Sequence, residues 1–500
     1  MEDISKSLDI NRKRIEDLFG VPDNFDFIIR DFEIETDKKA IKGFMVFYDG
    51  LVNKNFINRD ILRGLFQNIG NVPEDVKLED YIMRRIITLG PLSAQKDFNK
   101  AIEGVPFGNS LIFIDGCEVC FVADVKGWSS RGVDQPVREA SLSGPQEAFN
   151  EIVMNNLALI RKILKDPNLI AENIPVGTKS KTPCALLYIR GITNKELVRE
   201  VKRRLKLIET EYIFSSSDIE MLLETKTFLP LTRTLKTERP DRAASMLSEG
   251  KVIVIVQGSP FVLVLPTTAV DLIEASEDNY VRVTEANFMR LVRMVGIGLS
   301  LLLPGVFIAI MMYHREVVPS DLLLAIEATR EVVPFPLVVE LVLMELAFEL
   351  IKEASVRVPS PVGSSLGIIG GLILGQAAVE ANIVSPISII IVSVAGLGTF
   401  AAPSVALSRS LSVTRFLFIL FGAISGLLGI VFVFFLGTAY LASSLNFGVP
   451  FLSPLTPKDG ESAIEAVLVK PIWKKERRPK NLKTQNPIKQ PHISRKWLNK

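Results

Sequence analysis

Acidic side chains inside apolar stretches are the residues of this chain best suited to chemistry. Residues 333–354 read VPFPLVVELVLMELAFELIKEA, an apolar stretch that carries four glutamates. Ionisable groups at membrane depth are costly, and they commonly mark ion or substrate paths. A second apolar stretch ends with a glutamine and a glutamate four residues apart. The candidate pore or ion-path residues are therefore Gln376, Glu380, Glu340, Glu345 and Glu349.

Catalytic, cofactor-binding and metal-binding patterns are missing from the sequence. The chain has two histidines, His314 and His492, so a His-based triad or an HExxH zinc site cannot be assembled. Neither GxxxxGK[ST] nor GxGxxG occurs. Cys117 and Cys120 form a CxxC, but in a predicted hairpin, where two strand cysteines explain it better than a redox or zinc site. We expect no catalytic residue, no cofactor, no metal and no enzymatic activity.

Composition divides the 500 residues into soluble and membrane parts. Hydrophobic residues make up 48% and charged residues 23%, with a mean hydropathy of +0.29. Charges are spread along the chain before about residue 288, and long apolar segments fill 289–443. A net charge of +2 gives no global field for nucleic acid. Residues 1–20 lack the apolar core of a signal peptide, and three cysteines build no disulfide framework, so we expect a cytoplasmic N-terminal region.

The membrane domain is expected to span 286–445, with four crossings at about 291–313, 362–379, 387–402 and 416–442. Seven Lys or Arg and one Glu lie between Lys470 and Lys483, and such a basic tail stays cytoplasmic. Both ends on one side require an even number of crossings, so 320–354 is expected to form interfacial or re-entrant helices, or to be buried among protein helices. A helical wheel places Glu345, Glu349, Glu353 and Lys352 on one face. Glu340 falls elsewhere and needs a partner of its own.

Glycines recur along two of the predicted spans, which leaves smooth grooves where another backbone can approach. Such grooves serve packing within one subunit, between subunits or around a pore, and the glycine spacing is the same in all three cases. The candidate helix-packing residues are Gly363, Gly367, Gly371, Gly375, Gly422 and Gly426.

Similar segments occur twice in the soluble half. FMVFYDGLVNK (44–54) pairs with ALLYIRGITNK (185–195), and NSLIFIDGCEVCFVADV (109–125) pairs with GKVIVIVQGSPFVLVLP (250–266). Both segments of the second pair have a strand, a glycine turn and another strand, as in a hairpin. We therefore predict an α/β region of two related small mixed-sheet subdomains, 1–128 and 166–285; the alternative is two unrelated sheets.

The intervening residues 129–165 are predicted to be a polar linker followed by a helix. The linker is either a solvated connection or a clasp between domains or subunits. The candidate contact residues are Arg131, Asp134, Arg138 and Glu139. The last segment, 446–500, is a basic cytoplasmic tail, for which anionic lipid is a better partner than RNA because aromatic residues are few.

Five segments together resemble the A subunit of GerA-type spore germination receptors. They are SSRGVDQPVREASLSGPQEAFNE, TERPDRAASMLSEGKVIVIVQGSPFVLVLP, TREVVPFPLVVELVLMELAFELIKEA, GQAAVEANIVSPISI and FGVPFLSPLTP. They run in order along nearly the whole chain. One departure is Ser143, where the family usually has Arg before Gly-Pro.

The resemblance implies an integral protein of the inner membrane of the bacterial spore, with both termini on the core side. It implies a complex with a transporter-like B subunit that binds the nutrient and a lipoprotein C subunit. It also implies that A subunits form a homo-oligomer that acts as a nutrient-gated cation channel at the start of germination. In this hypothesis, Glu345→Gln or Glu349→Gln weakens cation release.

The alternative is a non-conducting scaffold that relays the signal from the B subunit through the cytoplasmic domains. Conductance of the purified subunit in liposomes separates the two. A secondary transporter fits poorly, because four spans without an inverted repeat are few for that class.

Overall fold

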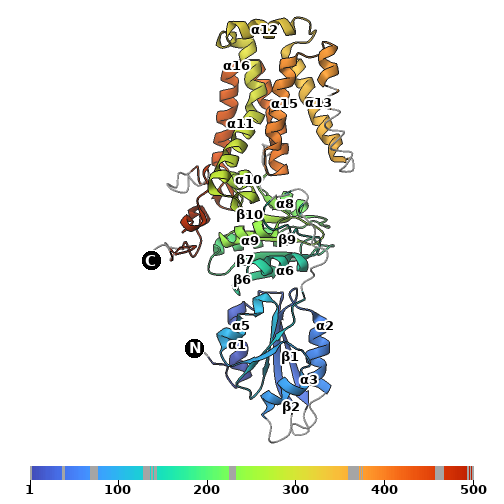
Figure 1. Ribbon diagram of the computed structural model, residues 1–500, viewed down its shortest axis with the longest axis vertical. Helices are drawn as coiled ribbons and strands as arrows, with labels where there is room; N and C mark the ends of the chain where they lie inside the picture. The colour runs from blue at the N-terminus through green and yellow to red at the C-terminus, as the bar shows by residue number, and fades with distance from the viewer. Residues whose placement is uncertain are drawn as a thin grey trace. The chain divides into compact units, whose positions relative to one another are not determined.

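The computed structural model describes residues 3–35, 40–67, 77–127, 136, 139, 143–224, 232–357, 371, 373, 375–456, 467–491, 495 and 497. The chain forms two units (Figure 1). Unit 1 comprises Met1–Glu224, Thr234–Pro266 and Trp473–Lys500, and unit 2 comprises Thr225–Arg233 and Thr267–Ile472. Unit 1 is therefore interrupted along the chain by unit 2, which contains the apolar helices.

The first sheet of unit 1 has the strand order β1-β2-β4-β5-β3. In β2, Met45 and Phe47 pack into one apolar core, whereas Phe44, Val46 and Tyr48 pack into another. Because successive strand residues point to opposite faces, the sheet is buried on both sides. Its elements are α1 (Leu8–Phe19), β1 (Phe27–Glu35), β2 (Ala40–Tyr48), α2 (Lys54–Phe56), α3 (Arg63–Gln67), α4 (Leu78–Tyr81), β3 (Leu92–Gln95), α5 (Phe98–Ile102), β4 (Asn109–Ile114) and β5 (Cys120–Asp124).

The second sheet repeats this order as β6-β7-β9-β10-β8. Gly116 and Gly258 adopt φ of 80° and 84° in the β4–β5 and β9–β10 turns, a region that favours glycine. The elements are α6 (Val153–Ile163), β6 (Leu169–Asn173), β7 (Cys184–Ile189), α7 (Lys195–Lys206), α8 (Ser216–Leu223), β8 (Leu235–Thr237), α9 (Pro240–Ser248), β9 (Val252–Val256) and β10 (Val262–Leu265).

Both sheets differ in one respect from the mixed sheets that we expected. Every strand pair that the structure describes in them is antiparallel. Apolar runs buried on both faces are typical of parallel sheets, but here two apolar cores cover an antiparallel one. The shared strand order agrees with the repeated segments.

Arg161 of α6 joins the two sheets into one unit. Its guanidinium donates to both carboxylate oxygens of Asp26 at 2.6 and 2.7 Å and to Asn24 Oδ1 at 2.9 Å. It also stacks over the Tyr48 ring at 4.0 Å. The Arg161 and Asp26 side chains are 2% and 1% exposed, so this ion pair is excluded from water. The linker helix thus fixes the first sheet to the second.

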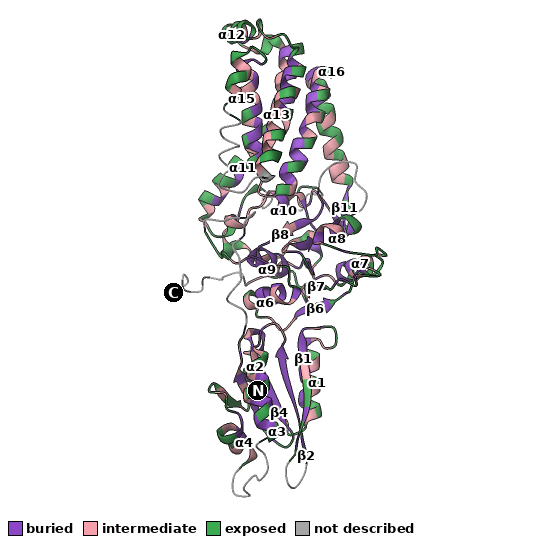
Figure 2. Ribbon diagram, turned by 90° about the vertical axis from the view of Figure 1, so that its right-hand side faces the viewer, coloured by how far each residue is buried: buried purple, intermediate pink, exposed green. Residues whose placement is uncertain are grey.

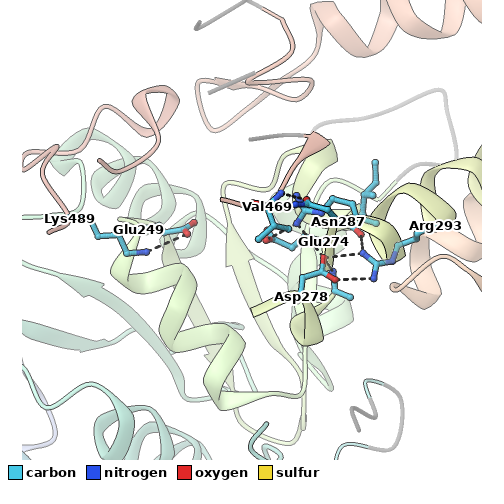
Figure 3. Close-up of polar contacts among 10 residues, drawn as sticks. Glu249, Glu274, Asp278, Asn287, Arg293, Val469 and Lys489 are labelled. Carbon is cyan, nitrogen blue, oxygen red and sulfur yellow. Dashed lines mark hydrogen bonds and ion pairs between the residues drawn. The ribbon is translucent and has the colours of Figure 1, made fainter. Parts of the chain in front are cut away.

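The end of the chain returns to unit 1. Arg478 Nε donates to the Ser248 carbonyl at 2.8 Å, and the Gln485 amide donates to the Ile192 carbonyl at 2.9 Å. Lys489 lies 3.7 Å from the Glu249 carboxylate (Figure 3). Residues 446–472, which the sequence grouped with this tail, instead belong to unit 2, where β11 (Leu445–Asn446) pairs with β12 (Val449–Pro450).

Unit 2 contains two helices that are long and apolar enough to cross a membrane, among the residues that the structure describes. They are α11 (Val283–Tyr313) and α16 (Val405–Ser443), and they contain the predicted spans 291–313 and 416–442. The predicted span 387–402 corresponds to α15 (Pro386–Phe400), whose 15 residues cover about 22 Å, less than a hydrocarbon core. The predicted span 362–379 lies largely outside the described residues. The expected number of four is therefore not met by the described helices.

The acidic segment forms a separate helix beside the others. α10 (Ala269–Ile273) precedes α11, α12 (Ser320–Arg330) ends before the two prolines of the segment, and α13 (Leu337–Arg357) follows them. α13 packs against α15 and α16 (Figures 1 and 2). Leu343, Leu346 and Leu350 remain exposed on its other side. The segment is thus half packed against protein and half open, which explains its mixed composition.

Candidate functional site

A buried arginine connects four helices of unit 2. Arg415 of α16 is 0% exposed and donates to Glu345 Oε2 of α13 at 2.5 Å. It also donates to the Ser300 carbonyl of α11 at 2.6 Å and the Ser300 hydroxyl at 2.8 Å. On α15 it donates to the Ala395 carbonyl at 3.2 Å and to the Thr399 hydroxyl. A buried guanidinium needs this many acceptors because it stays charged.

Glycines allow the helices to come close enough for these contacts. An added Cβ at Gly398 of α15 would lie 2.2 Å from the Gly296 carbonyl oxygen of α11. An added Cβ at Gly422 of α16 would lie 2.6 Å from the Gly305 carbonyl oxygen. Any side chain at these positions would push the backbones apart. Among the sequence candidates, the structure places Gly422 in such a contact within the chain.

The remaining candidate glycines have different surroundings. An added Cβ at Gly371 would meet nothing within 4 Å, and one at Gly375 would meet only Ile389 at 3.9 Å. Gly363 and Gly367 lie outside the described residues. No close contact is therefore described for the four-residue glycine repeat in this chain.

Gly426 breaks α16 and also packs against Tyr313 of α11, since an added Cβ would lie 3.1 Å from the tyrosine ring. Its φ of 60° and ψ of −144° are not helical. Tyr313 of α11 donates its hydroxyl to the carbonyls of Ala423 and Ile424, at 2.7 and 3.0 Å. A break frees backbone carbonyls, which need partners away from water. The Tyr313 hydroxyl is a hydrogen-bond donor for these carbonyls, so a specific contact stabilises the break.

Glu340 has a separate partner, as the helical wheel indicated. Its Oε1 accepts from the Ser385 amide at 2.5 Å and from the Ser385 hydroxyl at 2.6 Å. Ser385 is the residue before α15, so the carboxylate lies at the N-terminus of that helix, where negative charge is stabilised. Arg330 Nε lies 3.7 Å from Glu340 Oε2. The structure thus places Glu340 at a junction between α12, α13 and α15.

Glu345 and Glu349 retain acceptor capacity on one face of α13. Glu345 Oε1 and Glu349 Oε1 are buried and accept no hydrogen bond within the described residues. Lys352 Nζ lies 3.6 Å from Glu349 Oε2 and donates to the Ser412 hydroxyl at 3.1 Å. Carboxylate oxygens without donors can accept a proton, a water or a cation. This face of α13 therefore combines the buried ion pair of Glu345 and Arg415 with carboxylate oxygens of Glu345 and Glu349 that accept no described hydrogen bond.

Gln376 and Glu380 lie outside this network. They sit in the helical residues 375–380, and both are exposed. Gln376 Nε2 donates to Glu380 Oε1 at 3.1 Å. The structure therefore separates the sequence candidates: Glu340 and Glu345 are enclosed between helices, whereas Gln376 and Glu380 face outward.

In unit 1, Glu139 docks the linker onto the second sheet. Its carboxylate accepts from Arg242 at 2.6 Å and from the Thr237 hydroxyl at 2.5 Å. Its carbonyl accepts from Arg239 at 3.2 Å, and Arg239 also donates to both oxygens of Asp241. The other candidate clasp residues, Arg131, Asp134 and Arg138, lie outside the described residues. The contact that the structure describes is within one chain.

The CxxC motif shows no sign of reactivity. Cys117 and Cys120 are buried free cysteines. Burial raises the pKa of Cys117 to about 12, and it also raises the pKa of Cys120. A thiol that stays protonated is a poor nucleophile and a poor metal ligand.

Sequence reasoning missed Arg415 and the pair Arg239 and Arg242. Arg415 directly precedes the predicted span 416–442, and a charge at such a position usually ends an apolar segment. The signal that could have identified Arg415 is Glu345, because a carboxylate within an apolar segment requires a cation as its partner.

Comparisons with known proteins match most of the chain to spore germination proteins. The family model described as Bacillus/Clostridium GerA spore germination protein matches residues 13–481. Spore germination protein KA of Bacillus subtilis (strain 168) is 36% identical, with 95% of this chain and 88% of that protein covered. Spore germination protein GerLA of Bacillus cereus is 31% identical, with 95% of each covered. Spore germination protein A1 of Bacillus subtilis (strain 168) is 34% identical, with 84% of this chain and 87% of that protein covered.

Among solved structures, the N-terminal domain of the A subunit of the Bacillus megaterium spore germinant receptor GerK3 is 27% identical. The match covers 53% of this chain and 96% of that domain, with a TM-score of 0.40.

Proposed function

Because the chain belongs to the GerA family of spore germination proteins, we propose that it is a membrane subunit of a nutrient-sensing germination receptor. In this proposal, copies of the chain form an oligomeric, nutrient-gated cation channel in the inner membrane of the spore. It works with the B and C subunits of the receptor, and both of its termini face the spore core. It has no catalytic role of its own.

One observation supports an oligomeric path over a path through a single chain. The interior between α11, α13, α15 and α16 is occupied by Arg415 and its acceptors. By contrast, Glu380 and Gln376 are exposed. In a ring of subunits an exposed glutamate becomes a circle of negative charge, which favours cations over anions.

Spores that carry Glu380→Gln test this proposal. We expect slower cation release after nutrient addition, with the protein present at its normal level. The matched control is Glu331→Gln, which removes another exposed carboxylate of unit 2. Normal release from spores with Glu380→Gln, or equally slowed release from spores with Glu331→Gln, would count against Glu380 as a pore residue.

The scaffold remains a second candidate, because the closed interior of the single chain also fits a subunit that does not conduct ions. The two functions separate in liposomes that contain the purified subunit. Cation conductance in an oligomeric preparation supports the channel. Absence of conductance at every oligomeric state, with intact assembly with the B and C subunits, supports the scaffold.

A further inference from the structure

The start of the tail is fixed to the beginning of α11. The Asn287 side chain accepts from the Val469 amide at 2.6 Å and donates to the Val469 carbonyl at 3.3 Å (Figure 3). Arg293, about two turns further along α11, donates to both oxygens of Asp278 at 3.1 Å. These polar contacts mark the end of α11 that lies outside the hydrocarbon. Val469 is therefore held at the level where α11 enters the membrane.

The next part of the tail cannot lie far from that level. Trp473 follows Val469 by four residues, and a fully extended chain covers about 3.5 Å per residue. Trp473 is therefore within about 14 Å of Val469. The headgroup region of one leaflet is about 5–8 Å thick, so the chain keeps Trp473 within about two such thicknesses of Val469.

Some residues of the tail attach it to unit 1. Leu482 is buried, Arg478 and Gln485 bind backbone carbonyls, and Lys489 faces Glu249. Other residues of the tail are exposed and combine cations with large apolar groups, of which Ile472 is 68% and Trp473 40% exposed. Within the described residues no carboxylate pairs with its four exposed cations, which are Lys474, Arg477, Lys480 and Lys483.

We propose that these exposed residues of the tail, within Ile472–Lys483, dock on the anionic lipid surface of the membrane that α11 and α16 cross. Cations attract acidic headgroups, and each one near the surface strengthens binding by about fivefold. Tryptophan and isoleucine beside them fit the boundary between headgroups and acyl chains. Arg495 stacks on the Trp473 ring at 3.6 Å and adds a further cation.

A lipid surface fits better than a nucleic acid for a physical reason. The bilayer is attached to the same chain, so its effective concentration at the tail is high, whereas a nucleic acid must be captured from solution. Single-stranded nucleic acid also needs aromatic side chains on which successive bases stack. Between Ile472 and Lys483 the only aromatic residue is Trp473.

Tryptophan quenching in the full-length protein tests the proposal. The chain has three tryptophans, so Trp128→Phe with Trp497→Phe leaves Trp473 as the only reporter. This protein is reconstituted into phosphatidylcholine vesicles, with or without phosphatidylglycerol, that carry lipids brominated near the headgroup. We expect bromine to lower Trp473 emission by about twofold in anionic vesicles and much less in zwitterionic ones. High salt should abolish the difference, because it screens exposed charges.

Two charge variants show whether the tail itself is responsible. In the test variant the four exposed tail cations are replaced, as Lys474→Gln, Arg477→Gln, Lys480→Gln and Lys483→Gln. The matched control removes four exposed cations of α7, as Lys195→Gln, Arg199→Gln, Arg203→Gln and Lys206→Gln. Quenching should be lost in the tail variant and kept in the α7 variant. Exposed substitutions of this kind have little effect on folding.

Three results would overturn the proposal. The first is Trp473 emission that bromine leaves unchanged in anionic vesicles. The second is equal loss of quenching in the α7 variant, which would reduce the effect to overall charge. The third is a shift of Trp473 emission on adding a single-stranded oligonucleotide to zwitterionic vesicles, absent from the tail variant, which would assign the surface to nucleic acid.

Discussion

Replacing Glu345 with Gln is expected to destabilise the membrane unit by about 3–5 kcal/mol, the cost of removing one partner of a buried ion pair. Both side chains are at most 1% exposed, so water cannot replace the lost carboxylate. Arg415 cannot release its proton in response. Its contacts with Ser300 and Thr399 are neutral acceptors, which stabilise a charge less than a carboxylate does.

The measurement is reversible unfolding of the purified protein in mixed micelles with increasing amounts of a denaturing detergent. Arg415→Gln and the double variant complete a thermodynamic cycle. We expect the double variant to be more stable than the sum of the single changes predicts, by about 2 kcal/mol or more. Additive effects, within about 0.5 kcal/mol, would refute a direct pair between these side chains.

Glu349→Gln is the matched control one turn along the same helix. Its carboxylate lies 3.6 Å from Lys352, and its side chain is 29% exposed. A partly exposed pair of this kind contributes about 1 kcal/mol or less. If Glu349→Gln lowered the free energy of unfolding as much as Glu345→Gln, the burial of the ion pair would not determine how much stability is lost.

Three further outcomes follow from individual contacts. Gly398→Leu should prevent α15 from packing on α11 and lower the yield of folded protein, whereas Gly371→Ala should leave it unchanged, as measured by size-exclusion chromatography in detergent. Burial raises the pKa of Cys117 and of Cys184 to about 12, so both thiols stay protonated at pH 8. Iodoacetamide at pH 8 should therefore label them slowly in the native protein and rapidly after denaturation. Arg161→Lys keeps the charge but loses the bidentate contact with Asp26, so it should lower the midpoint of urea unfolding of unit 1. An unchanged midpoint would show that the contact is dispensable.

The spacing of apolar and charged residues predicted which strands are buried and which face of a helix each glutamate lies on. Apolar runs around Met45 and Val254 predicted strands buried on both faces, because a run of Ile, Val and Phe without alternation has no polar side to expose. The wheel placed Glu340 apart from Glu345, because residues five apart on a helix point in different directions. Strand pairing was less predictable, since register and direction depend on contacts between distant segments.

The polar centre of the membrane unit could not be predicted from local patterns. Arg415 stands beside an apolar segment, where a cation usually marks the headgroups. Its burial depends on acceptors that lie far away in the sequence, on Ser300 and Glu345. The break at Gly426 was equally hidden, because a glycine in a groove and a glycine with positive φ look the same in a sequence. The φ of 60° at Gly426 and the Tyr313 hydroxyl on the neighbouring carbonyls distinguish them in the structure.

The interruption of unit 1 by unit 2 has a consequence for biosynthesis. Roughly 200 residues are translated between Pro266 and Trp473, which takes about 10–40 s at ordinary elongation rates. During that time the carbonyls of Ile192 and Ser248 lack their hydrogen-bond donors, because the tail has not yet been synthesised. The tail reaches them only if it emerges on the same side of the bilayer. A chain inserted with an odd number of crossings would leave this surface uncovered, so the docking of the tail reports whether the membrane unit was inserted correctly.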